Sequence, residues 1–108
     1  MTTRTKALEI AAKVRAELQN IYGDRLRGVY LFGSCARGEG GEDSDVDIAI
    51  VLDHVADRFA ERERTSDLFT DLSLAEGIFV SRVFVSEEDF RRSHNALYQA
   101  IRTEGVPV

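Results

Sequence analysis

The sequence GVYLFGSCARGEGGEDSDVDIAIVL, residues 28–52, determines how the rest of the chain is interpreted. Two apolar runs, residues 29–32 and 46–52, flank a loop rich in glycine and small polar residues. Short apolar runs bounded by turn residues are typical of buried strands. Ten residues separate Ser34, near the start of the loop, from Asp45, near its end. The stretch therefore predicts two strands joined by a loop whose two ends carry polar groups.

Two aspartates, Asp45 and Asp47, stand at the head of the second apolar run. Side chains alternate along a strand, so both aspartates point to the same face. Their Cα atoms are expected about 6.6 Å apart, which is two rises of roughly 3.3 Å. Two carboxylates on one face repel each other without a counter-charge, and carboxylates are ligands that Mg²⁺ prefers. We therefore expect Asp45 and Asp47 to be metal ligands.

Gly33 and Ser34 follow directly on the first apolar run and are expected to begin a helical turn. The start of a helix presents N–H groups and a partial positive charge, which together bind phosphate. Gly33 has a simpler interpretation as a turn glycine, and Ser34 has one as a helix cap. A phosphate site at one end of the loop and metal ligands at the other describe a nucleoside-triphosphate site.

The same loop resembles a known family. Gly33-Ser34, ten residues, and then Asp45-x-Asp47, with Ala36-Arg37-Gly38 in between, is similar to the nucleotidyltransferase superfamily that includes DNA polymerase beta. The closest likeness is to the stand-alone minimal nucleotidyltransferases of bacteria and archaea. The resemblance implies an α/β class with the nucleotidyltransferase (polymerase beta palm-like) fold, in which a small mixed sheet of three or more strands packs with helices.

The resemblance also implies roles for individual residues. Asp45 and Asp47 would be catalytic and would hold the cofactor, Mg²⁺ or alternatively Mn²⁺. Gly33, Ser34 and Arg37 would bind the phosphates of the nucleotide, and a guanidinium is well suited to phosphate. The alternative for Arg37 is a surface arginine without a role in binding.

One feature departs from the family pattern. The resemblance implies a third carboxylate on a neighbouring strand, facing the first two, where it aligns or deprotonates the attacking hydroxyl. Residues 78–85 are the candidate strand, and they contain no acid. Ser81 and Arg82 occupy that strand. The candidates for the third carboxylate are Glu76, just before the strand, and, less favoured, Asp71 on the preceding helix. Nucleotide and metal binding are therefore more firmly indicated than catalysis.

Composition narrows the functional classes. The 108 residues are expected to form one domain, residues 1–108, with an apolar share of 44%. The formal net charge of −5 argues against binding to long nucleic acids, which requires clustered Lys and Arg. No run reaches the roughly twenty apolar residues that span a bilayer. Cys35 is the single cysteine, which favours a packing role and a cytoplasmic location.

Hydrophobic spacing and breakers predict the remaining elements. Ser86 is expected to cap a helix because acidic residues follow it. The expected inward side chains include Phe59, Phe69 and Leu97, whereas residues 61–64 are expected to form a solvated charged face. The predicted elements are helix 3–22, strand 27–32, strand 45–52, helix 56–74, strand 78–85 and helix 93–104.

The leading functional hypothesis is transfer of a nucleoside monophosphate, AMP from ATP, to a hydroxyl acceptor. The resemblance implies a small helical partner protein encoded nearby, often the toxin of a toxin–antitoxin pair, and a homo-oligomer is also compatible with it. The alternative hypothesis is a catalytically silent module that binds a nucleotide or a protein and neutralises its partner by contact. A weaker third alternative is a sensor of ATP.

Overall fold

The computed structural model describes residues 3–39 and 45–108. Within them, four strands form one mixed sheet in the order β3-β2-β1-β4. Strand β1 runs antiparallel to β2 and β4, whereas β2 runs parallel to β3. This architecture confirms the expected α/β class. The strands are β1 (Leu26–Phe32), β2 (Val46–Leu52), β3 (Val80–Ser86) and β4 (Val106–Pro107).

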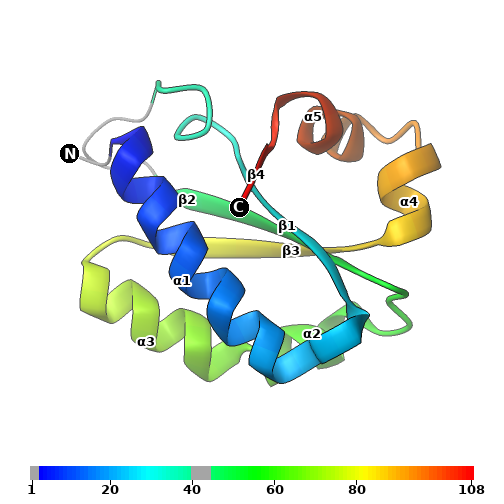
Figure 1. The fold of residues 1–108 in the computed structure, drawn as a ribbon, viewed down its shortest axis with the longest axis horizontal. Coiled ribbons are helices and arrows are strands. Elements are labelled where there is room, and N and C mark those ends of the chain that lie inside the picture. The colour runs from blue at the N-terminus through cyan, green and yellow to red at the C-terminus, as the bar shows by residue number, and fades with distance from the viewer. Residues whose placement is uncertain (1–2, 40–44) are drawn as a thin grey trace.

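Helices cover both faces of the sheet (Figure 1). Helices α1, α2 and α3 lie on one side of the sheet, and α4 and α5 lie on the other. Across the two described ranges, no helix combines the length and the apolar character needed to cross a bilayer. The helices are α1 (Arg4–Tyr22), α2 (Arg58–Arg64), α3 (Ser66–Glu76), α4 (Glu87–Arg92) and α5 (Ala96–Glu104), with a 3-10 turn η1 (Gly23–Arg25) after α1.

Helix α1 builds the main core together with the sheet. Thr3 caps the helix, because its side-chain oxygen accepts a hydrogen bond from the Lys6 N–H at 3.1 Å. The helix ends before Gly23, whose φ of 56° is one that other residues rarely adopt. Burying an aliphatic side chain contributes about 1.5–3 kcal/mol, so the fully buried face of α1 is a large source of stability. That face consists of Ala7, Ile10, Ala11, Val14 and Leu18.

The second face of the sheet is covered only in part. Ala49 and Val85 of the sheet are completely buried there against Ile101 of α5, in the layer that α4 and α5 form. Side chains on this face become more exposed towards the start of β2 and the start of β3. Along β2, Ala49 is buried, Asp47 is partly buried and Asp45, just before the strand, is exposed. Next to it, Val85 of β3 is buried, and Phe79, just before β3, is exposed. The helical layer therefore leaves one end of this face open to solvent.

The single helix expected over residues 56–74 is instead two helices, α2 and α3, which meet at Thr65. Thr65 has φ −105° and ψ 4°, which is not helical geometry, and its side chain is completely buried. Arg82 of β3 reaches into this junction. Its guanidinium donates to Thr65 Oγ1 at 2.9 Å and to the Arg62 carbonyl at 2.8 Å, so it caps the end of α2. A residue twenty positions away thus ends the helix.

Two expected inward side chains are exposed. Phe59 is 70% exposed and Leu97 is 43% exposed, so both expectations were wrong, whereas Phe69 is buried as expected. Glu61, not Phe59, occupies the inward side of α2. Positions two apart on a helix are separated by about 200°, so Phe59 faces solvent. In α5, Tyr98 and Ile101 make the contacts with the sheet cluster.

Glu61 was also expected on a solvated face, and the structure shows it only 6% exposed. The Tyr22 hydroxyl donates to its Oε1 at 2.9 Å, and Arg64 donates to the same oxygen at 3.0 Å. Arg25 contacts Oε2 at 3.5 Å. Burial by itself raises the pKa of Glu61, but the hydrogen bonds from Tyr22 and Arg64 and the nearby arginine charges outweigh it and lower the pKa. Glu61 therefore joins α1, η1 and α2 as an ionised, buried acceptor.

Strand β3 forms one edge of the sheet. Two of its carbonyls are bonded by arginines of α2: Arg62 donates to the Arg82 carbonyl at 3.3 Å, and Arg58 donates to the Phe84 carbonyl at 3.2 Å. An edge strand with unpaired backbone groups is a template for strand addition. These two bonds occupy backbone acceptors of β3 and so make it a poorer template for strand addition.

Replacing Glu61 by glutamine is expected to destabilise the fold by about 1–3 kcal/mol, because a buried acceptor that serves a phenol and two arginines loses its charge. The exposed neighbour Glu63 is the matched control, and E63Q is expected to change stability by no more than about 0.5 kcal/mol. Urea unfolding of the two variants measures the difference. Equal losses in E61Q and E63Q would contradict a structural role for Glu61.

The same pair of variants gives a pH test. The pKa of Glu61 is lowered in the folded state, so its contribution is complete above the ordinary glutamate pKa and is lost as the pH falls through the folded-state value. The difference in unfolding free energy between wild type and E61Q should therefore shrink in an acid series.

Candidate functional site

The two aspartates of the motif lie at the open end of the sheet. Asp45 immediately precedes β2 and is exposed, and Asp47 is the second residue of the strand and is partly buried. The residues at 46, 48 and 50 point into the main core. By strand alternation, the aspartates share the opposite face, as expected. Among the described residues, no lysine or arginine forms an ion pair with either carboxylate.

Asp47 is held between two neighbouring strands. Its Cα pairs with Phe32 at the end of β1 and with Ser81 in β3. The Ser81 hydroxyl donates a hydrogen bond to Asp47 Oδ1 at 2.6 Å. This short bond to a carboxylate orients the side chain and leaves its other oxygen, Oδ2, on the side of Gly33.

Gly33 is required by the position of that carboxylate. Its φ is +79°, in the left-handed region that favours glycine. A β-carbon placed on Gly33 would collide with Oδ2 of Asp47. The sequence alone indicated close approach of a phosphate at Gly33. The structure shows a further reason for the glycine, because the space next to it is filled by the second aspartate of the motif.

The described residues after Gly33, 34–39, form turns and not a regular helix. The Arg37 N–H donates to the Gly33 carbonyl at 3.3 Å, and the Glu39 N–H donates to the Ser34 carbonyl at 2.9 Å. The first of these bonds closes a single helical turn, as expected. In such a turn the first N–H groups have no acceptor within the turn. Ser34 lies at its start and is partly buried.

Cys35 connects the two ends of the motif loop. Its side chain is 1% exposed and belongs to the main core, which confirms a packing role. The thiol donates to the backbone carbonyl of Asp45 at 3.4 Å. Burial raises the pKa of the Cys35 thiol, and the charges of Asp47 and Asp45 raise it further. Cys35 therefore stays protonated and available as a donor.

Arg37 is engaged by acidic side chains. Its Nε donates to Glu39 at 3.1 Å, and its Nη1 donates to Glu104 of α5 at 3.4 Å. The hydrogen bond to Glu39 is the main reason that the pKa of Arg37 is raised. Binding of phosphate by Arg37 would require exchange of these carboxylates for the ligand, and that role stays a prediction.

The candidates for a third carboxylate do not reach the aspartates. Glu76 accepts from Lys6 at 2.8 Å and from Lys13 at 2.9 Å, so it joins the end of α3 to α1. Asp71 is exposed on α3, on the other side of the sheet. In residues 3–39 and 45–108, no cluster of three His, Cys, Asp or Glu side chains could hold a metal ion.

Ser81 is the site residue that sequence reasoning placed in a strand without giving it a role. It lies in register with Asp47, at the position facing the motif where the resemblance implies a carboxylate. No motif in the sequence marks it. The two strands begin 34 residues apart in the sequence, at Val46 and Val80. Only their register in the sheet brings the two side chains together.

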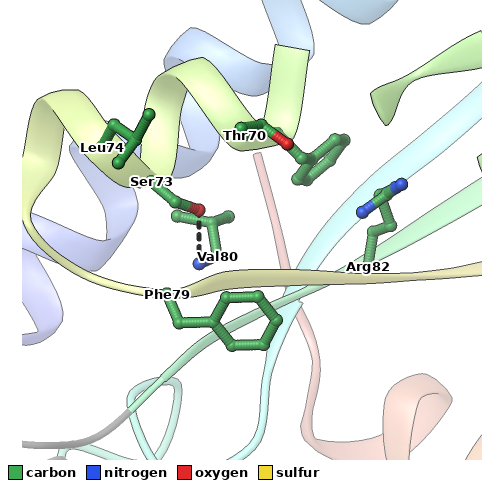
Figure 2. A pocket seen from close by; sticks show the side chains of 7 residues that line it. Thr70, Ser73, Leu74, Phe79, Val80 and Arg82 are labelled. Carbon is green, nitrogen blue, oxygen red and sulfur yellow. Dashed lines mark hydrogen bonds between the residues drawn. The ribbon is translucent and has the colours of Figure 1, made fainter. Parts of the chain in front are cut away.

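Two hollows lie on the opposite side of the sheet, beside α3. One has a volume of about 220 Å³ and is lined by residues of α3 and β3, including Phe69, Ser73 and Val80. Figure 2 shows this hollow, and Phe79 is among the residues that line it. Val80 and Arg82 point to the side of α3, whereas the Phe79 ring lies on the other side of the strand. The other, about 410 Å³, is lined by Arg62, Glu63, Ser66 and Arg82. Neither is lined by the motif aspartates.

Comparison with known proteins identifies the family of this chain. Residues 11–100 match the family described as nucleotidyltransferase domain. The "Putative protein adenylyltransferase MJ0604" of Methanocaldococcus jannaschii is 35% identical over 89 residues, which cover 82% of this chain and 83% of that protein. A second relative from the same organism, "Putative protein adenylyltransferase MJ0141", is 32% identical over 70% of this chain and 76% of its own length.

Solved structures share the fold. The crystal structure of a "putative nucleotidyltransferase" from Sulfolobus solfataricus superposes with a TM-score of 0.70 at 21% identity, covering 96% of this chain and 80% of that one. At this identity, the likeness shows the fold alone. A chain in a crystal structure of a toxin–antitoxin with AMP-PNP gives a TM-score of 0.62 at 26% identity, covering 88% of this chain and 69% of that chain.

The contact between Gly33 and Asp47 can be tested with a matched pair of variants. Gly38 also has a positive φ, +74°, but an added β-carbon meets nothing within 4 Å. Both G33A and G38A are expected to lose about 1–2 kcal/mol from left-handed strain. G33A is expected to lose about 1–3 kcal/mol more, because its methyl group displaces the carboxylate. Urea unfolding measures both losses, and equal losses would show that Asp47 does not need the space beside Gly33.

Proposed function

The chain belongs to the nucleotidyltransferase domain family, and on that premise we propose that it transfers AMP from ATP to a hydroxyl group of a partner protein. The observation that carries the proposal is the arrangement of Asp45 and Asp47 on one open face, beside the turn that starts at Gly33. Among the described residues, neither carboxylate has a cationic partner, so both remain available for ligands.

The donor set fits a hard divalent cation. Asp45 and Asp47 provide carboxylate oxygens, which are the ligands that Mg²⁺ and Mn²⁺ favour. Two carboxylates that share a face without a counter-charge also gain from a cation between them. Bound Mg²⁺ would supply neutralisation of the charge that develops on the transferred phosphate. Asp45 and Asp47 are the residues that would hold it.

The loop that follows β1 would hold the phosphates. Ser34 lies at the start of a helical turn, where the first N–H groups have no acceptor within the turn and can bind a phosphate. Gly33 keeps the backbone free of a side chain at this point, which also gives Asp47 its place. Arg37 would exchange Glu39 and Glu104 for the charged tail of the nucleotide, as its exposed position allows.

Ser81 orients Asp47 and is not a substitute for a general base. A serine hydroxyl donates a hydrogen bond to the carboxylate and cannot take up a proton at neutral pH. Phosphoryl transfer proceeds through a loose transition state in which positioning and charge neutralisation contribute most of the rate. The absence of an acid at position 81 is therefore compatible with catalysis.

The proposed substrates draw support from two relatives. A protein that is 35% identical bears the name of a protein adenylyltransferase, and a structural neighbour is a toxin–antitoxin structure with AMP-PNP. We therefore propose ATP as the donor and a helical protein encoded beside this chain as the acceptor. The net charge of −5 fits this choice better than a long nucleic acid.

The second candidate function is a silent module that neutralises a partner by contact. The observation that favours it is Ser81, which stands in register with Asp47 where the resemblance implies a carboxylate. In this case the partner would bind with the same affinity to wild type and to Asp45→Asn, and no nucleotide would be transferred.

The two functions are distinguished by transfer of label from [α-³²P]ATP, in Mg²⁺ buffer, to the helical protein encoded beside this chain, called the neighbouring protein below. Wild type should label the acceptor, and D45N and D47N should each reduce the rate by at least about a hundredfold, as losses of key electrostatic groups do. The exposed Asp71 is the matched control, and D71N should retain full activity. If wild type does not label the acceptor, and the acceptor binds D45N as tightly as it binds wild type, the enzyme is rejected and the silent module is supported.

Ser81→Ala tests the positioning of Asp47. Loss of a hydrogen bond behind a metal ligand commonly lowers metal affinity by about 10–100-fold, so S81A should weaken Mn²⁺ binding within this range. The affinity for Mn²⁺ is measured by calorimetry or by electron paramagnetic resonance of the free ion. The control is Ser93→Ala, on the connection between α4 and α5, which should bind Mn²⁺ as wild type does. An unchanged Mn²⁺ affinity in S81A would show that Asp47 is oriented without the hydroxyl.

A further inference from the structure

An exposed aromatic side chain lies beside the proposed site. Phe79 is 61% exposed, and its carbonyl accepts a hydrogen bond from the Val46 N–H at 3.0 Å, so it is fixed next to the start of β2. Figure 2 shows its ring on the opposite side of β3 from Val80 and Arg82. Phe79 immediately precedes β3 at the edge of the sheet, where it also borders the hollow beside α3. Its ring lies at the open end of the face that carries Ser81 and Asp47.

The order of the strands shows on which side of the two aspartates Phe79 lies. The proposed phosphate-binding turn follows β1, the two aspartates are on β2, and Phe79 precedes β3, while the sheet order places β2 between β1 and β3. In phosphoryl transfer, the attacking and leaving oxygens lie roughly in line through the phosphorus atom. Pyrophosphate that leaves on the side of β1 thus requires the acceptor to approach from the side of β3.

The alternative use of Phe79 is a platform for the nucleobase. The base is attached through the ribose to the α-phosphate and does not lie on the line between the attacking and leaving groups. The turn at Ser34 and the residues of β1 are on the side away from Phe79. The position of Phe79 beyond the aspartates, on the attacking side, therefore favours contact with the acceptor over contact with the nucleotide.

We propose that the Phe79 side chain binds the acceptor protein. The acceptor hydroxyl then lies next to an apolar or aromatic group of that protein, which packs against the Phe79 ring. The inference rests on the proposed AMP transfer. In that reaction the acceptor oxygen forms a bond to the α-phosphorus, the bond from phosphorus to the bridging oxygen of pyrophosphate breaks, and the hydroxyl proton passes to solvent. Phe79 takes no part in the bond changes and determines which acceptor is bound.

Steady-state kinetics provide the first test, with the neighbouring protein as acceptor. Phe79→Ala should raise the KM for the acceptor about tenfold or more and leave the KM for ATP within about twofold, and Phe79→Leu should restore part of the affinity because it keeps an apolar side chain. Phe59 is the matched control, since it is also a largely exposed phenylalanine but lies on α2, on the other side of the sheet. F59A should leave both KM values unchanged. A rise in the KM for ATP in F79A would overturn the proposal in favour of base stacking.

Photocross-linking provides a second test that does not need turnover. Benzoylphenylalanine is introduced at position 79 or at position 59, and each protein is irradiated with the neighbouring protein and with [α-³²P]ATP in Mg²⁺. Cross-linking to the partner at position 79 and not at position 59 supports the proposal. Preferential cross-linking to ATP, or equal cross-linking from both positions, overturns it. Absence of AMP transfer by wild type would instead reject the proposed function, and the cross-link would still decide whether Phe79 meets the partner.

Discussion

The contact of Asp47 with Gly33 and Ser81 is the constraint on which the site depends. It joins the end of β1, the start of β2 and the start of β3 through one side chain. The Ser81 hydroxyl bonds one carboxylate oxygen at 2.6 Å, and the absence of a β-carbon at Gly33 gives the other oxygen its space. A carboxylate held in this way loses little further freedom when it binds a ligand. The first residue of the motif loop, Gly33, is therefore in contact with Asp47, the proposed metal ligand, and Cys35 adds a second contact, to the Asp45 carbonyl.

The fold treats its carboxylates in two contrasting ways. Glu61 is buried and surrounded by Tyr22, Arg25 and Arg64, which bond its carboxylate and lower its pKa. Glu76 is similarly matched by two lysines of α1. The motif aspartates stand at the end of the sheet that α4 and α5 leave open, and among the described residues they have no cation beside them. Structural acids are neutralised within the protein, whereas those at the site are placed where an external cation can reach them.

Much of the architecture was predictable from periodicity. The apolar spacing of α1, its cap at Thr3 and its end at Gly23 all depend on residues within a few turns of each other. The long apolar runs predicted β1 and β2 within one residue. The errors arose where distant residues intervene. Arg82 ends α2 by binding the Arg62 carbonyl, and Glu61 takes the inward position that hydrophobicity assigned to Phe59. Local patterns carry no information about such contacts.

By itself, the sequence determined most of the elements, the α/β class and the motif of Gly33, Ser34, Asp45 and Asp47, because these follow from the alternation and spacing of neighbouring residues. The tertiary structure alone decided what surrounds the motif. The parallel register of β2 with β3 sets Ser81 against Asp47, and the limited reach of α4 and α5 leaves Phe79 exposed on the same face. The physical reason is that strand register and the extent of a helical layer depend on how whole elements pack together, and no local stretch of residues records that.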